Sequence, residues 1–204
     1  MSERFSIAQV SPYPWEQHHD VNRYVERVAA ELRSRGHRVV VVAPSDSRKL
    51  IREGRARVKA VVAGDQDALF ADDVLAIGQS LPFRRGRAVS LPIDVSRTLE
   101  DLLGAAELDF VHVHEPFAPS AASAALRHSR TLNVGTFHAT AERFLSTQVA
   151  RRVVQLLFGR LDARTATSEA AGELMERFFP ADYTVVAPGA DAIGSAGGEG
   201  PPEI

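Results

Sequence analysis

Asp109-Phe-Val-His-Val-His-Glu-Pro-Phe117 contains a run of β-branched and aromatic residues, Phe110 to Val113, that predicts a short strand. This strand delivers His114 and the two residues after it to its carboxyl end. A second short strand, predicted at Leu132 to Thr136, delivers Phe137 and His138 in the same way. The two strands therefore each place a histidine at or just beyond their carboxyl end.

An alanine-rich helix is predicted between these strands, beginning at Pro119 and Ser120. Proline is tolerated in a first helical turn because the N–H that it lacks has no partner there. Two consecutive strand–helix units describe one edge of an open parallel sheet, and ligands of such sheets bind outside the carboxyl ends of the strands. We therefore expect the functional site at this edge.

The beginning of the chain predicts a β–α–β unit. Phe5 to Val10 is the first strand, and apolar residues at helical spacing from Val21 to Leu32 form one face of an amphipathic helix. Asp20 is at the predicted N-cap of this helix and Gly36 at its left-handed C-terminal position. The continuous apolar run Val39 to Ala43 is typical of a strand that is buried on both faces.

The alternation of strands and helices along the chain predicts an α/β fold, a doubly wound and mostly parallel sheet with helices on both faces. An exposed basic loop, Leu81 to Pro92, carries three arginines and could contact anionic lipid headgroups. The other predicted elements are strands at Arg57 to Ala63, Val74 to Ile77, Asp162 to Thr167 and Tyr183 to Ala187, and helices at Ser96 to Leu103 with Gly104 as stop, Thr140 to Phe158 and Ser168 to Phe178.

Composition excludes several classes of protein. The net charge of −2 supplies no excess of cations to neutralise phosphates, which argues against a nucleic-acid partner. The chain contains no cysteine, so disulfides and thiolate metal sites are excluded. The N-terminus lacks the pattern of a signal peptide, and no window has the length of a membrane-spanning helix. We expect a cytoplasmic protein that is at most peripheral to the inner face of the membrane.

Motifs for the common catalytic and cofactor sites are absent. Neither a Walker A sequence nor Gly-x-Gly-x-x-Gly follows the first strand, and no Gly-x-Ser-x-Gly supports Ser-His-Asp hydrolysis. His112 and His114 would share one face of their strand, and together with Glu115 they could be metal ligands in a metal-dependent hydrolase. The simpler interpretation makes His112 a packed core residue and His114 a residue of the sheet edge. We expect neither metal nor cofactor.

The chain resembles the N-terminal half of a GT-B glycosyltransferase of the retaining family-four type, and within it the actinobacterial phosphatidylinositol mannosyltransferases. The resemblance extends to about Asp191 and implies a Rossmann-like domain that holds the acceptor. The residues that carry it are Ser11-Pro-Tyr-Pro-Trp15, Val21 to His37, Val39 to Pro44, His112-Val-His-Glu-Pro116 with Ala118-Pro-Ser120, Thr136-Phe-His138 and Pro188-Gly-Ala-Asp191.

The same resemblance implies roles for particular residues. His138 would lie at the cleft as the catalytic residue, hydrogen-bonding the sugar or the acceptor near the reacting centre. Glu115 would position the edge of the sheet rather than act as a base. The remaining implied substrate-binding residues are Tyr13, His19, Asp20, His114 and Phe117.

Two departures from the relatives concern the acceptor. Relatives often carry Gly-Gly before the first helix, whereas this chain has His19-Asp20, and a carboxylate at the N-cap disfavours a second anion there. The lipid mannosyltransferases also place an arginine where this chain has Ser90. Both changes favour an acceptor other than a phosphoinositide, such as an uncharged one.

The resemblance also predicts what lies beyond this domain. Residues 1–191 would be the acceptor-side domain, and residues 192–204 a linker toward a C-terminal domain that binds the nucleotide-sugar donor. The full-length protein would transfer the sugar with retention to a lipid, glycan or small-molecule acceptor, and this fragment alone would be inactive. The alternative is a freestanding binding module that kept the fold and lost catalysis.

Overall fold

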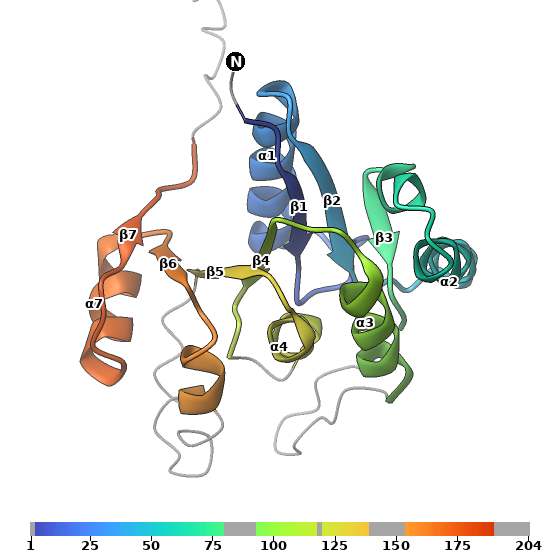
Figure 1. Cartoon of the computed structure of the whole chain (residues 1–204). Helices are drawn as coiled ribbons and strands as arrows, with labels where there is room; N and C mark the ends of the chain where they lie inside the picture. Colours follow the sequence, from blue (N-terminus) through green and yellow to red (C-terminus); the bar gives the residue numbers. More distant parts are fainter. Residues whose placement is uncertain (1–2, 80–92, 118–119, 139–153, 190–204) are drawn as a thin grey trace, which may run out of the picture.

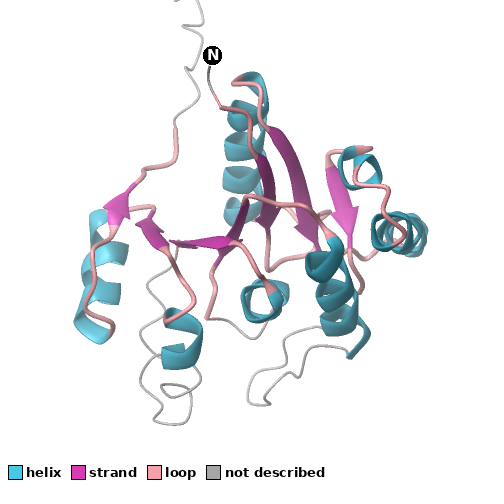
Figure 2. Cartoon of the chain, viewed as in Figure 1, coloured by secondary structure: helices cyan, strands magenta, loops and turns pink. Residues whose placement is uncertain are grey.

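The protein is a single parallel sheet covered by helices on both faces, as the sequence predicts (Figures 1 and 2). The computed structural model describes residues 3–79, 93–117, 120–138 and 154–189. The order of the strands is β3-β2-β1-β4-β5-β6-β7, and every neighbouring pair is parallel. The strands are β1 (Ser6–Val10), β2 (Arg38–Ala43), β3 (Val74–Ala76), β4 (Phe110–His114), β5 (Leu132–Phe137), β6 (Ala163–Ala166) and β7 (Thr184–Val185).

The helices divide between the two faces of the sheet. Helix α1 (Asp20–Ser34) packs through Val25 and Ala29 on the side chains of Ile7 and Val41. The opposite face carries the larger hydrophobic core, to which the other helices contribute, and α1 is drawn on the other side of the sheet from α3 and α4 (Figure 1). Further helices are α2 (Arg48–Val62), the 3-10 helix η1 (Asp67–Phe70), α3 (Ile93–Ala105), α4 (Ala121–His128) and α7 (Glu169–Phe178).

The chain reverses its direction of travel across the sheet between β1 and β4. Strands β1, β2 and β3 follow one another outward on one side, and β4 to β7 follow one another on the other side. This reversal is the switch point at which open parallel sheets bind their ligands, outside the carboxyl ends of the strands. β4 lies at this point and ends at His114.

The N-cap of α1 is His19, so the prediction of Asp20 at this position is wrong by one residue. His19 has an extended backbone, and its Nδ1 accepts a hydrogen bond from the N–H of Val21 at 3.1 Å. Asp20 is the first helical residue, and its carboxylate pairs with Arg23 at 3.1 Å. The left-handed Gly36 after the helix, with φ 92°, is confirmed.

The strand predicted at Arg57 to Ala63 is wrong, because residues 57–62 belong to α2 and Ala63 is its C-cap. Ser47 caps this helix, and its buried positions Ile51, Gly54, Val58 and Val61 follow a spacing of three and four residues. Arg57 is not a surface strand residue: its guanidinium donates to the backbone carbonyls of Ala68, Leu69, Asp72 and Val74. Helical periodicity and this anchoring outweigh the β-branched residues of the segment.

Several boundaries differ slightly from those predicted. α3 continues through Gly104 to Ala105, and β7 is shorter than Tyr183 to Ala187. Ser168 caps α7 by accepting from the N–H of Ala171, as predicted. Residues 154–158 are helical, whereas the rest of the predicted helix from Thr140, the basic loop of 81–92 with Ser90, and residues 192–204 lie outside the described residues.

Candidate functional site

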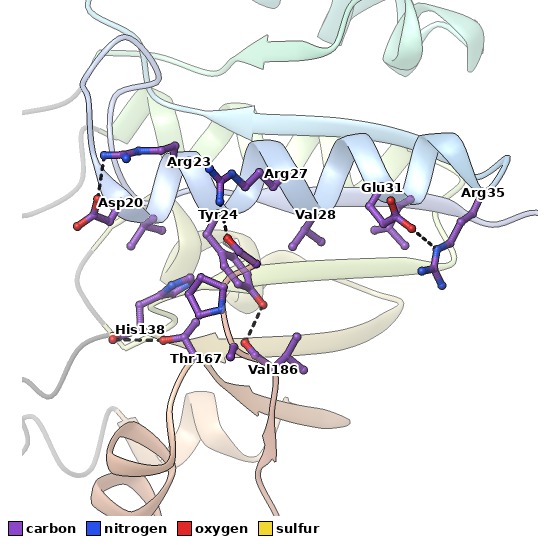
Figure 3. A pocket seen from close by; sticks show the side chains of 15 residues that line it. Asp20, Arg23, Tyr24, Arg27, Val28, Glu31, Arg35, His138, Thr167 and Val186 are labelled. Carbon is purple, nitrogen blue, oxygen red and sulfur yellow. Dashed lines mark hydrogen bonds and ion pairs between the residues drawn. The ribbon is translucent and has the colours of Figure 1, made fainter. Parts of the chain in front are cut away.

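A groove of about 740 Å³ runs along α1, between this helix and the segment that follows β7 (Figure 3). His138 and Thr167 lie near its end at the N-terminus of α1, and Arg35 lies near the other end. Two hydrogen bonds connect its sides, from the hydroxyl of Tyr24 to the carbonyl of Val186 at 3.5 Å and from Arg27 to the carbonyl of Gly189 at 2.6 Å. The remaining lining residues are Asp20, Val21, Arg23, Val28, Glu31, Leu32, Ala187 and Pro188.

Three histidines meet beside the inner end of this groove. Nδ1 of His114 is 2.9 Å from Nε2 of His138, and Nε2 of His114 is 2.8 Å from Oε1 of Gln9. The ring of His112 stacks on that of His114 with centroids 4.4 Å apart, and its Nε2 is 2.6 Å from the hydroxyl of Thr136. The prediction that His112 and His114 share one face of the strand is confirmed.

The register of the sheet explains why these polar groups meet. Gln9 in β1 is aligned with His112 in β4, and His114 is aligned with Thr136 in β5. Aligned residues of parallel strands project from the same face of a sheet, as do residues two apart on one strand. His138 follows Thr136 by two positions, so it joins the same row at the carboxyl edge.

Glu115 holds the backbone at His138. It is the only described residue other than glycine with a positive φ, at 52°. Its backbone N–H donates to the carbonyl of Thr136 at 2.9 Å, and its Oε1 accepts from the backbone N–H of His138 at 2.8 Å. The carboxylate therefore holds the backbone at the end of β5.

The contribution of this carboxylate can be measured by comparing two variants. Replacement of Glu115 by alanine should reduce the free energy of unfolding by roughly 1–3 kcal/mol, because the N–H of His138 loses its acceptor. Replacement by glutamine should cost clearly less, since the amide oxygen can still accept. Both variants keep a side chain at the positive φ, so the difference in urea unfolding isolates the acceptor. Equal losses in the two variants would contradict this role.

All three histidines are neutral at pH 7. Burial, with the charge of His138, lowers the pKa of His112 to about 4, and burial, with the charge of His19, lowers that of His138 to about 4. Burial lowers the pKa of His114 well below its ordinary value, with contributions from the charges of His112 and His138. Each ring therefore carries one N–H and one lone pair at neutral pH.

Acid should destabilise the protein through these rings. In the unfolded chain they bind protons near pH 6.5, whereas two of them do so only near pH 4 when folded. The unfolded state therefore holds more protons in this interval. As the pH decreases, the free energy of unfolding decreases by up to about 1.4 kcal/mol per pH unit for each ring. Urea unfolding between about pH 7 and about pH 5 tests this. The slope should be smaller in His112→Gln and unchanged in His18→Gln, an exposed histidine.

Only some of the other predicted site residues lie at the groove. The ring of Tyr13 stacks on that of His19 at 3.7 Å, and its pKa is raised by burial and by the charge of Glu115. Asp20 lines the groove, whereas Tyr13, His19 and His114 do not. Phe117 is a core residue on the other face, packed on Phe137, Phe158 and Phe179, and the structure does not bring it to the groove.

Sequence reasoning assigned no site role to Tyr24, Gln9 or Thr167. The ring of Tyr24 meets that of His138 edge-on, with centroids 4.8 Å apart. Tyr24 belongs to the apolar face predicted for α1, and Gln9 stands between the apolar residues Ala8 and Val10 of its strand. That position was the available signal for Gln9.

The histidine cluster is not arranged as a metal centre. Among the described residues, no three side chains of the metal-ligating types are grouped so that they could hold an ion. Both ring nitrogens of His114 face other side chains.

No helix in the described part of the chain is long and apolar enough to cross a membrane.

A parallel sheet that reverses between β1 and β4, with ionisable side chains gathered at the carboxyl ends there, defines a doubly wound α/β domain. The chain belongs to Glycosyltransferase Family 4, whose family model matches residues 21–192. The fold predicted from the resemblance, the N-terminal half of a GT-B enzyme, is confirmed.

Similar proteins include phosphatidyl-myo-inositol mannosyltransferases of three actinobacteria. The one from Propionibacterium freudenreichii subsp. shermanii is 25% identical over 187 residues, which cover 90% of this chain and 46% of the relative. The one from Mycolicibacterium smegmatis is 25% identical over 193 residues, which cover 93% of this chain and 45% of the relative. The one from Mycobacterium tuberculosis is 23% identical over 188 residues, which cover 91% of this chain and 45% of the relative. The chain thus spans a little under half the length of these relatives.

Proposed function

We propose that this chain is the acceptor-side domain of a glycosyltransferase that moves a sugar, with retention, from a nucleotide-diphosphate sugar to an acceptor. The observation that carries the proposal is the family match over residues 21–192, which includes His138 and all of the groove-forming helix α1 except Asp20. The place of His138 at the carboxyl edge of the sheet supports it, because ligands of doubly wound sheets bind there.

The groove offers contacts suited to an amphipathic acceptor. Tyr24, Val28 and Leu32 contribute apolar surface from α1, and Val186 and Pro188 contribute it from the opposite side. Hydroxyl groups of a sugar or polyol could hydrogen-bond to His138 and Thr167 at the inner end. An acceptor that lies along α1 would thus have its polar group held beside the histidine cluster.

The start of α1 favours an acceptor without a phosphate at this position. The imidazole of His19 already accepts from the N–H of Val21, and the carboxylate of Asp20 occupies the first turn. The positive end of the helix dipole therefore has both a hydrogen-bonding partner and a negative charge beside it. We propose an uncharged lipid, glycan or small molecule rather than a phosphoinositide.

The donor would be bound mainly by a further domain. The curated relatives are about twice the length of this chain, and a nucleotide-binding half in the full-length protein would supply the contacts to the diphosphate. We propose that residues 1–191 are the acceptor-side domain and 192–204 the linker, that the enzyme needs no metal or cofactor, and that it does not act on nucleic acid. It would work in the cytoplasm, in peripheral contact with the membrane.

The choice of acceptor can be tested with the full-length protein and a panel of nucleotide sugars. Transfer to uncharged lipids or glycans should exceed transfer to phosphatidylinositol. Replacement of both His19 and Asp20 by glycine should raise transfer to phosphatidylinositol relative to the uncharged acceptors, because the helix terminus becomes accessible to an anion. Preference of the unaltered protein for phosphatidylinositol would contradict the proposed acceptor class.

A further inference from the structure

Gln9 is a fully buried polar residue in a central strand, and its side chain hydrogen-bonds to that of His114. Its Oε1 is 2.8 Å from Nε2 of His114, and it lies in β1 among the apolar residues Ile7, Ala8 and Val10. Buried polar groups in such a place are retained at a cost unless they form a specific hydrogen bond. Gln9, His114 and His138 form a hydrogen-bonded chain from the middle of the sheet to the groove.

The carboxamide of Gln9 sets the direction of this hydrogen-bonded chain. The oxygen of Gln9 can only accept, so Nε2 of His114 carries the proton and its Nδ1 carries the lone pair. Nδ1 of His114 therefore accepts from His138, whose proton must be on Nε2. Nδ1 of His138 is left with a lone pair, and no described residue hydrogen-bonds to that nitrogen.

The opposite direction would require the amide of Gln9 to be turned over. Its Nε2 would then donate to His114, and each ring would carry its proton on Nδ1. Either orientation leaves one amide atom of Gln9 without a partner among the described residues, as Nε2 is in this structure. The orientation with Oε1 toward His114 places both imidazoles in the Nε2–H form, which is the more stable tautomer of a neutral histidine side chain.

We infer that Gln9 and His114 are positioning residues that hold His138 in its Nε2–H tautomer, so that Nδ1 is a hydrogen-bond acceptor at the groove. A neutral acceptor pairs with a hydroxyl group and offers no proton to a phosphate or carboxylate oxygen. The inner end of the groove therefore selects a hydroxyl-bearing ligand. That this ligand is a sugar acceptor rests on the proposed function, whereas the tautomer does not.

The tautomer can be read directly from the nitrogen chemical shifts of the histidine rings. The chain is labelled with ¹⁵N-histidine and measured at neutral pH, and the signals of His138 are assigned by their loss in His138→Gln. We expect a protonated Nε2 and an unprotonated Nδ1 for His138. A protonated Nδ1 would overturn the inference, since the hydrogen-bonded chain would then run in the opposite direction.

Variants at Gln9 test whether the carboxamide sets this state. Gln9→Met removes the acceptor at similar volume, so the shifts of His138 should move toward the average of the two tautomers. Gln9→Glu keeps an acceptor at this position and should preserve the Nε2–H form. Gln155→Met, at an exposed glutamine, is the matched control and should change nothing. If His138 keeps its shifts in a folded Gln9→Met protein, Gln9 is not a positioning residue; if that variant does not fold, Gln9→Glu and the unaltered chain still decide.

Selection for a hydroxyl is tested by titration with two simple probes. myo-Inositol, which has only hydroxyl groups, should shift the Nδ1 signal of His138, and sulfate, an anion without an O–H at neutral pH, should not at the same concentration. A shift with sulfate, or with neither probe, would overturn the selection. These readouts need no sugar transfer, so a full-length protein that fails to transfer sugar would refute the proposed function and leave the tautomer assignment standing.

Discussion

Replacement of His138 by alanine is expected to lower kcat/KM of the full-length protein by roughly 100-fold without unfolding it. The side chain lines the groove at the carboxyl edge of the sheet, where a hydroxyl of the acceptor or of the sugar would meet it. Its loss removes that contact and also leaves Nδ1 of His114 without its donor. The fold should persist because the hydrogen bond from the backbone of residue 138 to Glu115 does not involve the ring.

The measurement is a steady-state assay of sugar transfer, with circular dichroism to verify the fold. His18→Ala is the matched control, because His18 is exposed and precedes the cap of α1. The control should retain the activity of the unaltered enzyme. If His138→Ala turns over as fast as the control, His138 has no part in the reaction and the site must lie elsewhere.

Replacement of Gly54 by alanine should reduce the free energy of unfolding by about 3 kcal/mol, which is the upper range for an overpacked core. Gly54 lies in α2 where the helix meets β3. A Cβ at this position would come within 2.0 Å of the carbonyl oxygen of Ala76. Backbone of a buried strand is on the other side of this contact, so the helix must move away from the sheet.

Gly104 provides the matched comparison in another helix. It lies in α3, and a Cβ there would meet no atom within 4 Å. Gly104→Ala should therefore stabilise the protein by about 0.5–1 kcal/mol, because alanine loses less backbone entropy than glycine on folding. Thermal or urea unfolding of the two variants should give changes of opposite sign. A neutral Gly54→Ala would mean that α2 does not pack on β3 in this way.

The sequence predicts the fold well where one periodicity is unambiguous. Val39 to Ala43, and the strand that ends at His114, are apolar or β-branched runs of strand length, and the structure has strands at both. The strand predicted at Arg57 to Ala63 is wrong because its valines favour a strand, whereas the spacing of Val58 and Val61 fits a helix. The tertiary contacts of Arg57, which are invisible in the sequence, show which periodicity is realised.

The site is only partly predictable for a different reason. His114, Glu115 and His138 follow directly after predicted strands, so their gathering at one edge could be foreseen from the parallel order. Gln9 meets His114 through a register between strands that lie 105 residues apart in the chain, and no local pattern encodes that register. The backbone conformation of His19, which is extended, likewise decides that His19 and not Asp20 is the N-cap, and no local pattern encodes it.

We propose that this chain is the acceptor-binding half of a sugar transferase. The most direct test is release of nucleoside diphosphate by the full-length protein from a panel of nucleotide sugars, measured with and without candidate acceptors. We predict release from one donor that depends on an acceptor and is largely lost in His138→Ala. A full-length protein that consumes no nucleotide sugar with any acceptor would contradict the account and leave a binding module that kept the family's fold.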